Sequence, residues 1–213
     1  MTTSNFLDSH YASADTGTPA LEVEDLHVGF PTDDGLVQAV RGVSFALAPG
    51  QALGLVGESG CGKSVSALSI MRLLPKITAR IVGGKILFNG RNLLELSDSE
   101  MRSVRGKDIS MIFQEPMTSL SPVHTIGNQI VEAVRLHFPV TVKEATERAI
   151  EALDRVGIPR PKEQMGAYTF QLSGGMSQRA AIALAVATEP DLVIADECTS
   201  ALDVTTQAEV VDL

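Results

Sequence analysis

The sequence predicts an α/β fold, with a core built on a mainly parallel sheet, an N-terminal antiparallel β section and an inserted helical subdomain. Three observations support this prediction. Apolar and charged residues alternate after residue 20, as in a half-buried strand. Short apolar runs at residues 52–56, 109–113 and 191–196 have the composition of strands buried on both faces. Between the last two runs, apolar residues recur with the helical period.

Composition and charge narrow the class of protein. The 213 residues are 44% hydrophobic and 20% charged, as in an ordinary globular chain. No apolar run approaches the ~18 residues of a spanning helix, so any membrane function would need another chain to cross the bilayer. The net charge of −9 argues against broad nucleic-acid binding, which needs a basic face. Two cysteines far apart in sequence, Cys61 and Cys198, do not suggest a disulfide framework.

The first elements follow from local pattern. Residues 1–20 are polar, without a basic start or an apolar stretch, and are expected to be a disordered lead rather than a secretory signal peptide. Residues 21–28 and 36–47 read as strands on either side of a turn at residues 31–35. This arrangement predicts the antiparallel section.

Residues 52–113 are expected to supply strands and a helix of the core. Residues 52–56 are predicted to be a buried strand of the parallel sheet, and residues 63–74 a helix ended by Pro75. Residues 85–88 predict a further strand, closed by a tight turn at Asn89 and Gly90. Residues 109–113 are a second candidate for a buried strand.

The later part is mainly helical. Helix-period segments at residues 126–134 and 145–156 predict two helices of a helical subdomain at about residues 115–175. A helix of small and apolar residues is expected at residues 176–188, followed by a strand at residues 191–196.

The segment from Gly57 to Ser64 matches G-x-x-x-x-G-K-[ST] in full, between a predicted strand and a predicted helix. Glycines let backbone N–H groups turn toward an anion, and the helix N-terminus adds its positive end. Lys63 then supplies a charge for the β- and γ-phosphates, and the Ser64 hydroxyl can ligate Mg²⁺. A glycine-rich turn that fits by chance is the weaker alternative. The sequence thus predicts a P-loop NTPase core that binds a nucleotide with Mg²⁺ through Gly57, Glu58, Ser59, Gly60, Cys61, Gly62, Lys63 and Ser64.

Two carboxylates, Asp196 and Glu197, follow the last predicted strand. Ligands of open α/β sheets bind at the carboxyl ends of strands. Asp196 is therefore a candidate Mg²⁺ ligand, and Glu197 a candidate catalytic residue that orients and polarises the attacking water. Alone, such a pair would also fit the start of a helix.

A Ser-Gly-Gly turn at Ser173 opens the helix before that strand, and it offers free N–H groups and a hydroxyl. By itself it would be read as a helix N-cap followed by two glycines. Beside a P-loop it is a candidate second anion site, formed by Ser173, Gly174, Gly175 and Gln178.

Together, the P-loop, the Ser-Gly-Gly turn and the Asp196-Glu197 pair resemble the nucleotide-binding domain of the ABC ATPase family, from about Leu21 to Leu213. The resemblance implies a head-to-tail dimer in which ATP lies between the P-loop of one copy and the Ser173 turn of the other. It also implies that Gln114 matches the Q-loop glutamine, which senses Mg²⁺ and the attacking water, and that Asp203 belongs to the loop that communicates across the dimer. Phe30 falls where an adenine-stacking aromatic is expected, although a hairpin-packing role fits equally well.

The residues in and around these motifs are similar to those of the ATP-binding subunits of bacterial dipeptide, oligopeptide and nickel importers. This likeness implies a peripheral subunit at the cytoplasmic face of the inner membrane. Its partners would be a two-part membrane permease and a second ATPase subunit, different or identical, with an indirect link to an extracytoplasmic solute-binding protein and no nucleic acid.

Two departures from the family pattern stand out. Cys198 occupies the usual position of a proline, and none of the four histidines follows Asp196, where the family has its switch histidine. The domain at residues 21–213 is thus expected to be incomplete at its C-terminus and to hydrolyse ATP poorly alone, because losing an orienting or acid–base group typically costs about 10²–10⁴ in rate. A non-catalytic nucleotide-binding remnant is one alternative. A soluble ABC-type ATPase acting on nucleic acid or ribosomes is the other, and the acidic charge weighs against it.

Overall fold

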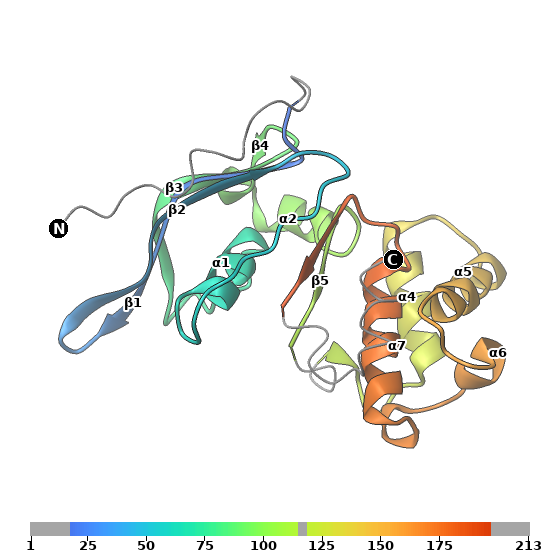
Figure 1. Ribbon diagram of the computed structural model, residues 1–213. Coiled ribbons are helices and arrows are strands. Elements are labelled where there is room, and N and C mark those ends of the chain that lie inside the picture. The colour runs from blue at the N-terminus through green and yellow to red at the C-terminus, as the bar shows by residue number, and fades with distance from the viewer. Residues whose placement is uncertain (1–17, 115–118, 197–213) are drawn as a thin grey trace.

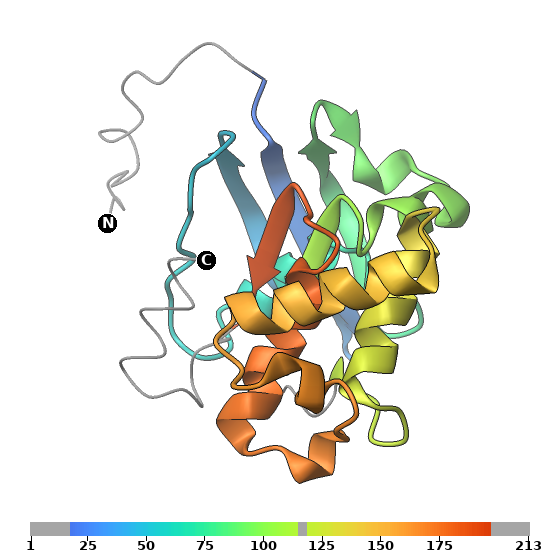
Figure 2. The ribbon, with the colours of Figure 1, turned by 90° about the vertical axis from the view of Figure 1, so that its right-hand side faces the viewer.

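The computed structural model describes residues 18–114 and 119–196, which contain two sheets (Figures 1 and 2). Their buried apolar side chains form two hydrophobic cores. The first sheet has the order β2-β1-β3-β4 and is antiparallel throughout. Its strands are β1 (Leu21–Thr32), β2 (Gly35–Leu47), β3 (Arg80–Phe88) and β4 (Arg91–Asn92). The predicted antiparallel section is confirmed, and β3 begins earlier than the sequence indicated.

The second sheet is the parallel pair β5 (Ile109–Ile112) and β6 (Leu192–Ala195). Ile109 lies opposite Leu192, and Ile112 opposite Ala195, so both strands end level with one another. Helix α1 (Lys63–Ile70) lies between this pair and the antiparallel sheet (Figure 1). The α/β fold is confirmed. Within the described residues its parallel part has two strands.

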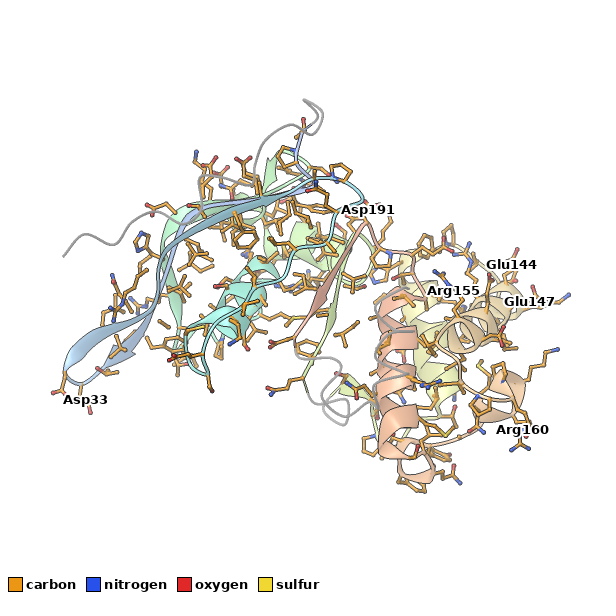
Figure 3. The ribbon with its side chains drawn as sticks, viewed as in Figure 1. Asp33, Glu144, Glu147, Arg155, Arg160 and Asp191 are labelled. Atoms are coloured by element: carbon orange, nitrogen blue, oxygen red, sulfur yellow. The ribbon has the colours of Figure 1, made fainter. Side chains whose placement is uncertain are left out.

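A helical part packs against the parallel pair. It comprises α4 (Ile126–His137), α5 (Val142–Arg155), the short α6 (Pro161–Gln164) and α7 (Gly174–Val186). Apolar side chains of α4, α5 and α7 form one core, to which Ile112 of β5 also belongs. The charged residues labelled in Figure 3 on this part, Glu144, Glu147, Arg155 and Arg160, point outward. None of its helices, nor any other helix in residues 18–114 and 119–196, is long and apolar enough to cross a membrane.

One predicted strand is wrong. Residues 51–58 have no regular secondary structure, and Val56 is 97% exposed. A strand buried on both faces needs a neighbour along each edge, and no strand among the described residues pairs with this segment. All residues of this segment are instead exposed, and the chain continues from it through the next turn into α1.

The end of α1 also differs from the prediction, and one helix was not predicted. Helix α1 ends at Ile70, four residues early, because the chain turns into the left-handed region at Arg72 (φ 49°). A helix that was not predicted, α2 (Asp98–Val104), follows the short 3₁₀ turn η1 (Leu93–Glu95). It begins with a capping box between Ser97 and Glu100, a signature that was legible in the sequence.

Candidate functional site

The P-loop joins the exposed segment to α1, and its shape depends on glycine. Gly60 and Gly62 have φ values of 79° and 99°, a region that side-chain-bearing residues rarely adopt. Gly62 is the N-cap residue of α1, where no side chain caps the helix. A Cβ atom there would lie 2.7 Å from the carbonyl oxygen of Ala39 in β2. The loop therefore rests against the antiparallel sheet at a point that only glycine fits.

This contact predicts the result of replacing Gly62 with alanine. Because the new methyl group meets a backbone atom and the backbone is left-handed, the free energy of unfolding should fall by about 1–3 kcal/mol, measured by urea denaturation. Gly174→Ala is the matched control, since a Cβ atom at Gly174 has nothing within 4 Å. Equal stability of the two variants would contradict the described path of the loop.

Lys63 reaches back over the loop that precedes it. Its Nζ donates hydrogen bonds to the carbonyl oxygens of Gly57 (2.7 Å) and Glu58 (2.9 Å), and it lies 3.8 Å from the Sγ of Cys61. The ammonium group is thus held against the first residues of the loop. An ammonium in such a turn, at a helix N-terminus, is the arrangement that binds the phosphates of a nucleotide.

Residues 132 positions apart meet at the start of α1. The Ser64 hydroxyl donates a hydrogen bond of 3.0 Å to Oδ1 of Asp196. Asp196 directly follows β6, and its amide donates to the Ile112 carbonyl at the end of β5 (2.9 Å). The parallel pair therefore delivers this carboxylate to the P-loop helix, as the sequence predicted for the carboxyl end of a strand.

A hydroxyl and a single carboxylate are ligands suited to Mg²⁺, which keeps several waters and takes the rest of its ligands from phosphates. Within residues 18–114 and 119–196 no cluster of three or more histidine, cysteine or acidic side chains forms a separate metal site. Gln114 lies two residues beyond β5 and is exposed at the same strand ends. Ser64 and Asp196 are thus brought together, and Gln114 follows the strand that pairs with the one before Asp196.

The Ser173 turn lies at the start of α7. Its hydroxyl accepts a hydrogen bond from the Met176 amide (3.3 Å) and caps the helix, while Ser173 and Gly174 are exposed. Within the described residues no hydrogen bond or ion pair joins this turn to the P-loop. Gln178 is 1% exposed, and its contact with nucleotide stays a prediction.

The remaining predicted site residues are Phe30, Glu197 and Asp203. Phe30 lies on β1 opposite Val37 of β2 and packs, half-buried, against the core of the antiparallel sheet, which is the hairpin-packing role. Its stacking on adenine stays a prediction. Glu197 and Asp203 lie outside the described residues, so their roles stay predictions as well.

Comparison with known proteins agrees with this geometry. The family model for ABC transporters matches residues 40–200, which include the P-loop, Gln114, the Ser173 turn and Asp196. The chain belongs to the ABC transporter family.

Relatives of this ABC transporter chain are about half identical to it. A probable peptide ABC transporter ATP-binding protein of Sinorhizobium fredii is 56% identical over 193 residues, covering 91% of this chain and 58% of that protein. The dipeptide transport ATP-binding protein DppD of Bacillus subtilis is 53% identical, with the same coverage. The oligopeptide transport ATP-binding protein OppD of Bacillus subtilis is 50% identical over 92% of the chain and 55% of that protein. The chain spans less than two thirds of the length of these relatives.

Solved structures show the same fold. A bacterial ABC transporter cassette, solved as a dimer, superposes with a TM-score of 0.81 at 24% identity, covering 90% of this chain and 80% of that one. The cbiO1 protein of Clostridium perfringens, part of an ABC transporter complex, has a TM-score of 0.71 at 25% identity, over 91% of this chain and 71% of that one.

Proposed function

We propose that this ABC transporter chain is part of the ATP-binding subunit of a membrane importer for peptides or nickel, and that it binds ATP with Mg²⁺. The observation that carries the proposal is the hydrogen bond between Ser64 and Asp196, next to an ammonium held inside a P-loop. This arrangement offers a cation, amide donors and two metal ligands to one triphosphate. The names of the peptide-transport relatives support the importer class.

The proposed reaction is ATP hydrolysis by water. The Lys63 ammonium would bind the β- and γ-phosphates, while the Ser64 hydroxyl and the Asp196 carboxylate would hold Mg²⁺ between them. Gln114 would contact the metal and the attacking water, and Glu197 would polarise that water as the general base. When bound, the metal neutralises charge that develops on the phosphates.

The Ser173 turn supports a composite site. The exposed residues Ser173 and Gly174 stand at the positive end of a 13-residue helix, which favours an anion. Since the turn makes no bond to the P-loop of its own chain within the described residues, we propose that Ser173, Gly174 and Gly175 close over nucleotide held by a second ATPase subunit, identical or related. Asp203 would take part in the contact between the two subunits. Bound ATP then joins the subunits and its hydrolysis separates them, which is a two-state element that can drive a permease.

The proposed partners are a two-part permease and, indirectly, an extracytoplasmic solute-binding protein, so the chain would lie at the cytoplasmic face of the inner membrane. Cell fractionation tests this placement. The tagged protein should sediment with membranes, and it should leave them when the permease genes are deleted. Sedimentation with ribosomes, unaffected by that deletion, would contradict the importer and favour an ATPase that acts on nucleic acid.

A further inference from the structure

The end of α1 opposite to the phosphate site is held in an unusual way. After Ile70 the chain closes the helix with a hydrogen bond from the Leu73 amide to the Leu68 carbonyl (2.9 Å), and Arg72 takes the left-handed conformation (φ 49°). Glycine usually occupies this position at a helix end, because a side chain is disfavoured there. Where an arginine adopts it, the surrounding structure has to hold it in place.

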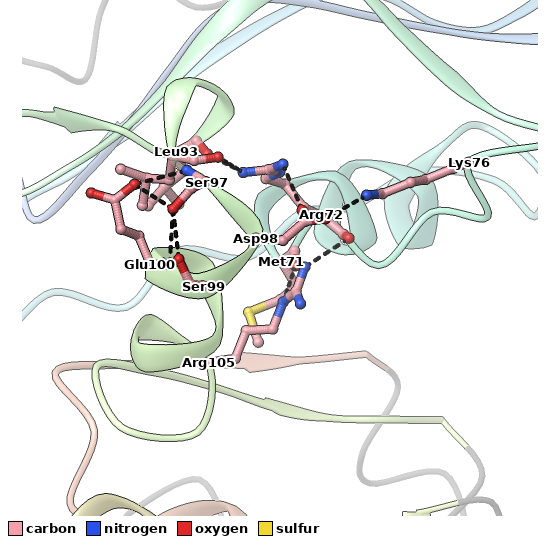
Figure 4. Close-up of polar contacts among 10 residues, drawn as sticks. Met71, Arg72, Lys76, Leu93, Ser97, Asp98, Ser99, Glu100 and Arg105 are labelled. Carbon is pink, nitrogen blue, oxygen red and sulfur yellow. Dashed lines mark hydrogen bonds and ion pairs between the residues drawn. The ribbon is translucent and has the colours of Figure 1, made fainter.

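Contacts of the Arg72 side chain with neighbouring segments hold this residue in place (Figure 4). Its guanidinium donates hydrogen bonds to the carbonyl oxygens of Leu93 (3.2 Å) and Leu96 (2.5 Å), and it lies 3.3 Å from the carboxylate of Asp98. A hydrogen bond from Lys76, with the charge of Arg72, lowers the pKa of Asp98 below its ordinary value, so this carboxyl is ionised at neutral pH. The end of α1 is therefore tied to η1 and to the start of α2.

A second guanidinium binds the same helix end from the far end of α2. Nε of Arg105 donates to the Met71 carbonyl (2.8 Å), and one Nη donates to the Arg72 carbonyl (2.9 Å). Cations are favoured beside the negative end of a helix, and α1 has no basic residue of its own in its last turn. The two arginines thus connect the C-terminal end of α1 to its surroundings. Arg72 lies in the chain that leaves α1, and Arg105 lies at the end of α2.

We infer that Arg72 and Arg105 are positioning residues for the nucleotide site. Helix α1 has only eight residues, about 12 Å at 1.5 Å per residue, so a shift at one end moves the other. At the first end Lys63 faces the loop and Ser64 meets Asp196. The arginines hold the helix in the one position that keeps Ser64 beside that carboxylate. This inference rests on the proposed function, because it assumes that ATP binds at this end.

The test compares two properties of the same variants. ATP affinity is measured by fluorescence anisotropy of mant-ATP, once with Mg²⁺ and once with EDTA, at a temperature where circular dichroism shows each variant to be folded. Arg105→Met keeps much of the apolar stem and removes the donors, whereas Arg105→Lys restores a charge without the two-pronged geometry. Arg102→Met is the control, since Arg102 is an exposed arginine on the same helix. Arg72→Gly is the second variant, because glycine readily adopts the left-handed backbone conformation and the substitution removes only the contacts of the side chain.

We expect Arg105→Met and Arg72→Gly to weaken Mg²⁺-dependent binding by about tenfold, because small displacements of binding groups cost this much or more. Binding with EDTA should change less, Arg105→Lys should recover part of the loss, and Arg102→Met should bind like the unsubstituted chain. If the melting temperature falls but both affinities of the folded variants are unchanged, the arginines only stabilise the fold and the inference is wrong. Absence of ATP binding by the unsubstituted chain would instead contradict the proposed function, and this inference with it.

Discussion

Replacing Lys63 with alanine should weaken ATP binding by about 100-fold, since truncating one partner of a hydrogen-bonded charge pair costs about 2–5 kcal/mol. In the structure the ammonium already binds the carbonyl oxygens of Gly57 and Glu58. It has three donor hydrogens and can therefore hold the loop and a phosphate oxygen together. Alanine removes both functions, which is why this effect should exceed those of the other variants. Titration with mant-ATP in the presence of Mg²⁺ measures it.

Lys143→Ala is the matched control for this experiment. Lys143 lies on α5, its side chain is 86% exposed, and its ion pair with Glu147 spans 3.9 Å. Its removal alters the net charge by the same amount as the Lys63 variant, so any general electrostatic effect on ATP appears in both. Similar affinities of the two variants would mean that Lys63 does not contact phosphate.

Replacing Asp196 with asparagine should remove the gain in ATP affinity that Mg²⁺ provides. Asparagine keeps an oxygen that can accept the hydrogen bond from Ser64, so the local structure should persist. It lacks the negative charge that a hard cation requires, and loss of a charge-assisted contact of this kind costs about tenfold or more. ATP affinity measured in EDTA should be unchanged or higher, because one charge that repels the triphosphate is gone.

Asp191→Asn serves as the control for this variant. Asp191 is exposed at the other end of β6 (Figure 3), so both substitutions remove one carboxylate next to the same strand. The Mg²⁺ response should survive in Asp191→Asn alone. A full Mg²⁺ response in Asp196→Asn would place the metal elsewhere.

The sequence predicted those parts of the site that depend on short-range chemistry. The glycine pattern, Lys63 and Ser64 follow from what a backbone turn must do around phosphate, and the meeting of Ser64 with Asp196 follows from a strand that ends in a carboxylate. The alternation of apolar and charged residues predicted the antiparallel section, in which the apolar residues Val23 and Val28 are buried.

Other features depend on contacts between distant segments, which a single sequence does not reveal. The apolar run at residues 52–56 has the composition of a buried strand, yet nothing in that composition says which strands lie beside it, and the structure leaves Val56 exposed. Gln178 is predicted to contact nucleotide, whereas the packing of α7 leaves it 1% exposed. Arg72 and Arg105 carried no motif, because their function is to bind carbonyl oxygens far along the chain.

We expect Ser64 and Asp196 to form one metal and phosphate centre with the P-loop. Crystallisation of the chain with Mn²⁺ and a non-hydrolysable ATP analogue, with anomalous scattering recorded for manganese, tests it most directly. We expect a single manganese peak within coordination distance of the Ser64 hydroxyl, beside the Asp196 carboxylate, and phosphates that lie against the amides of residues 58–63. A manganese peak distant from Asp196, or a triphosphate bound away from that loop, would contradict it.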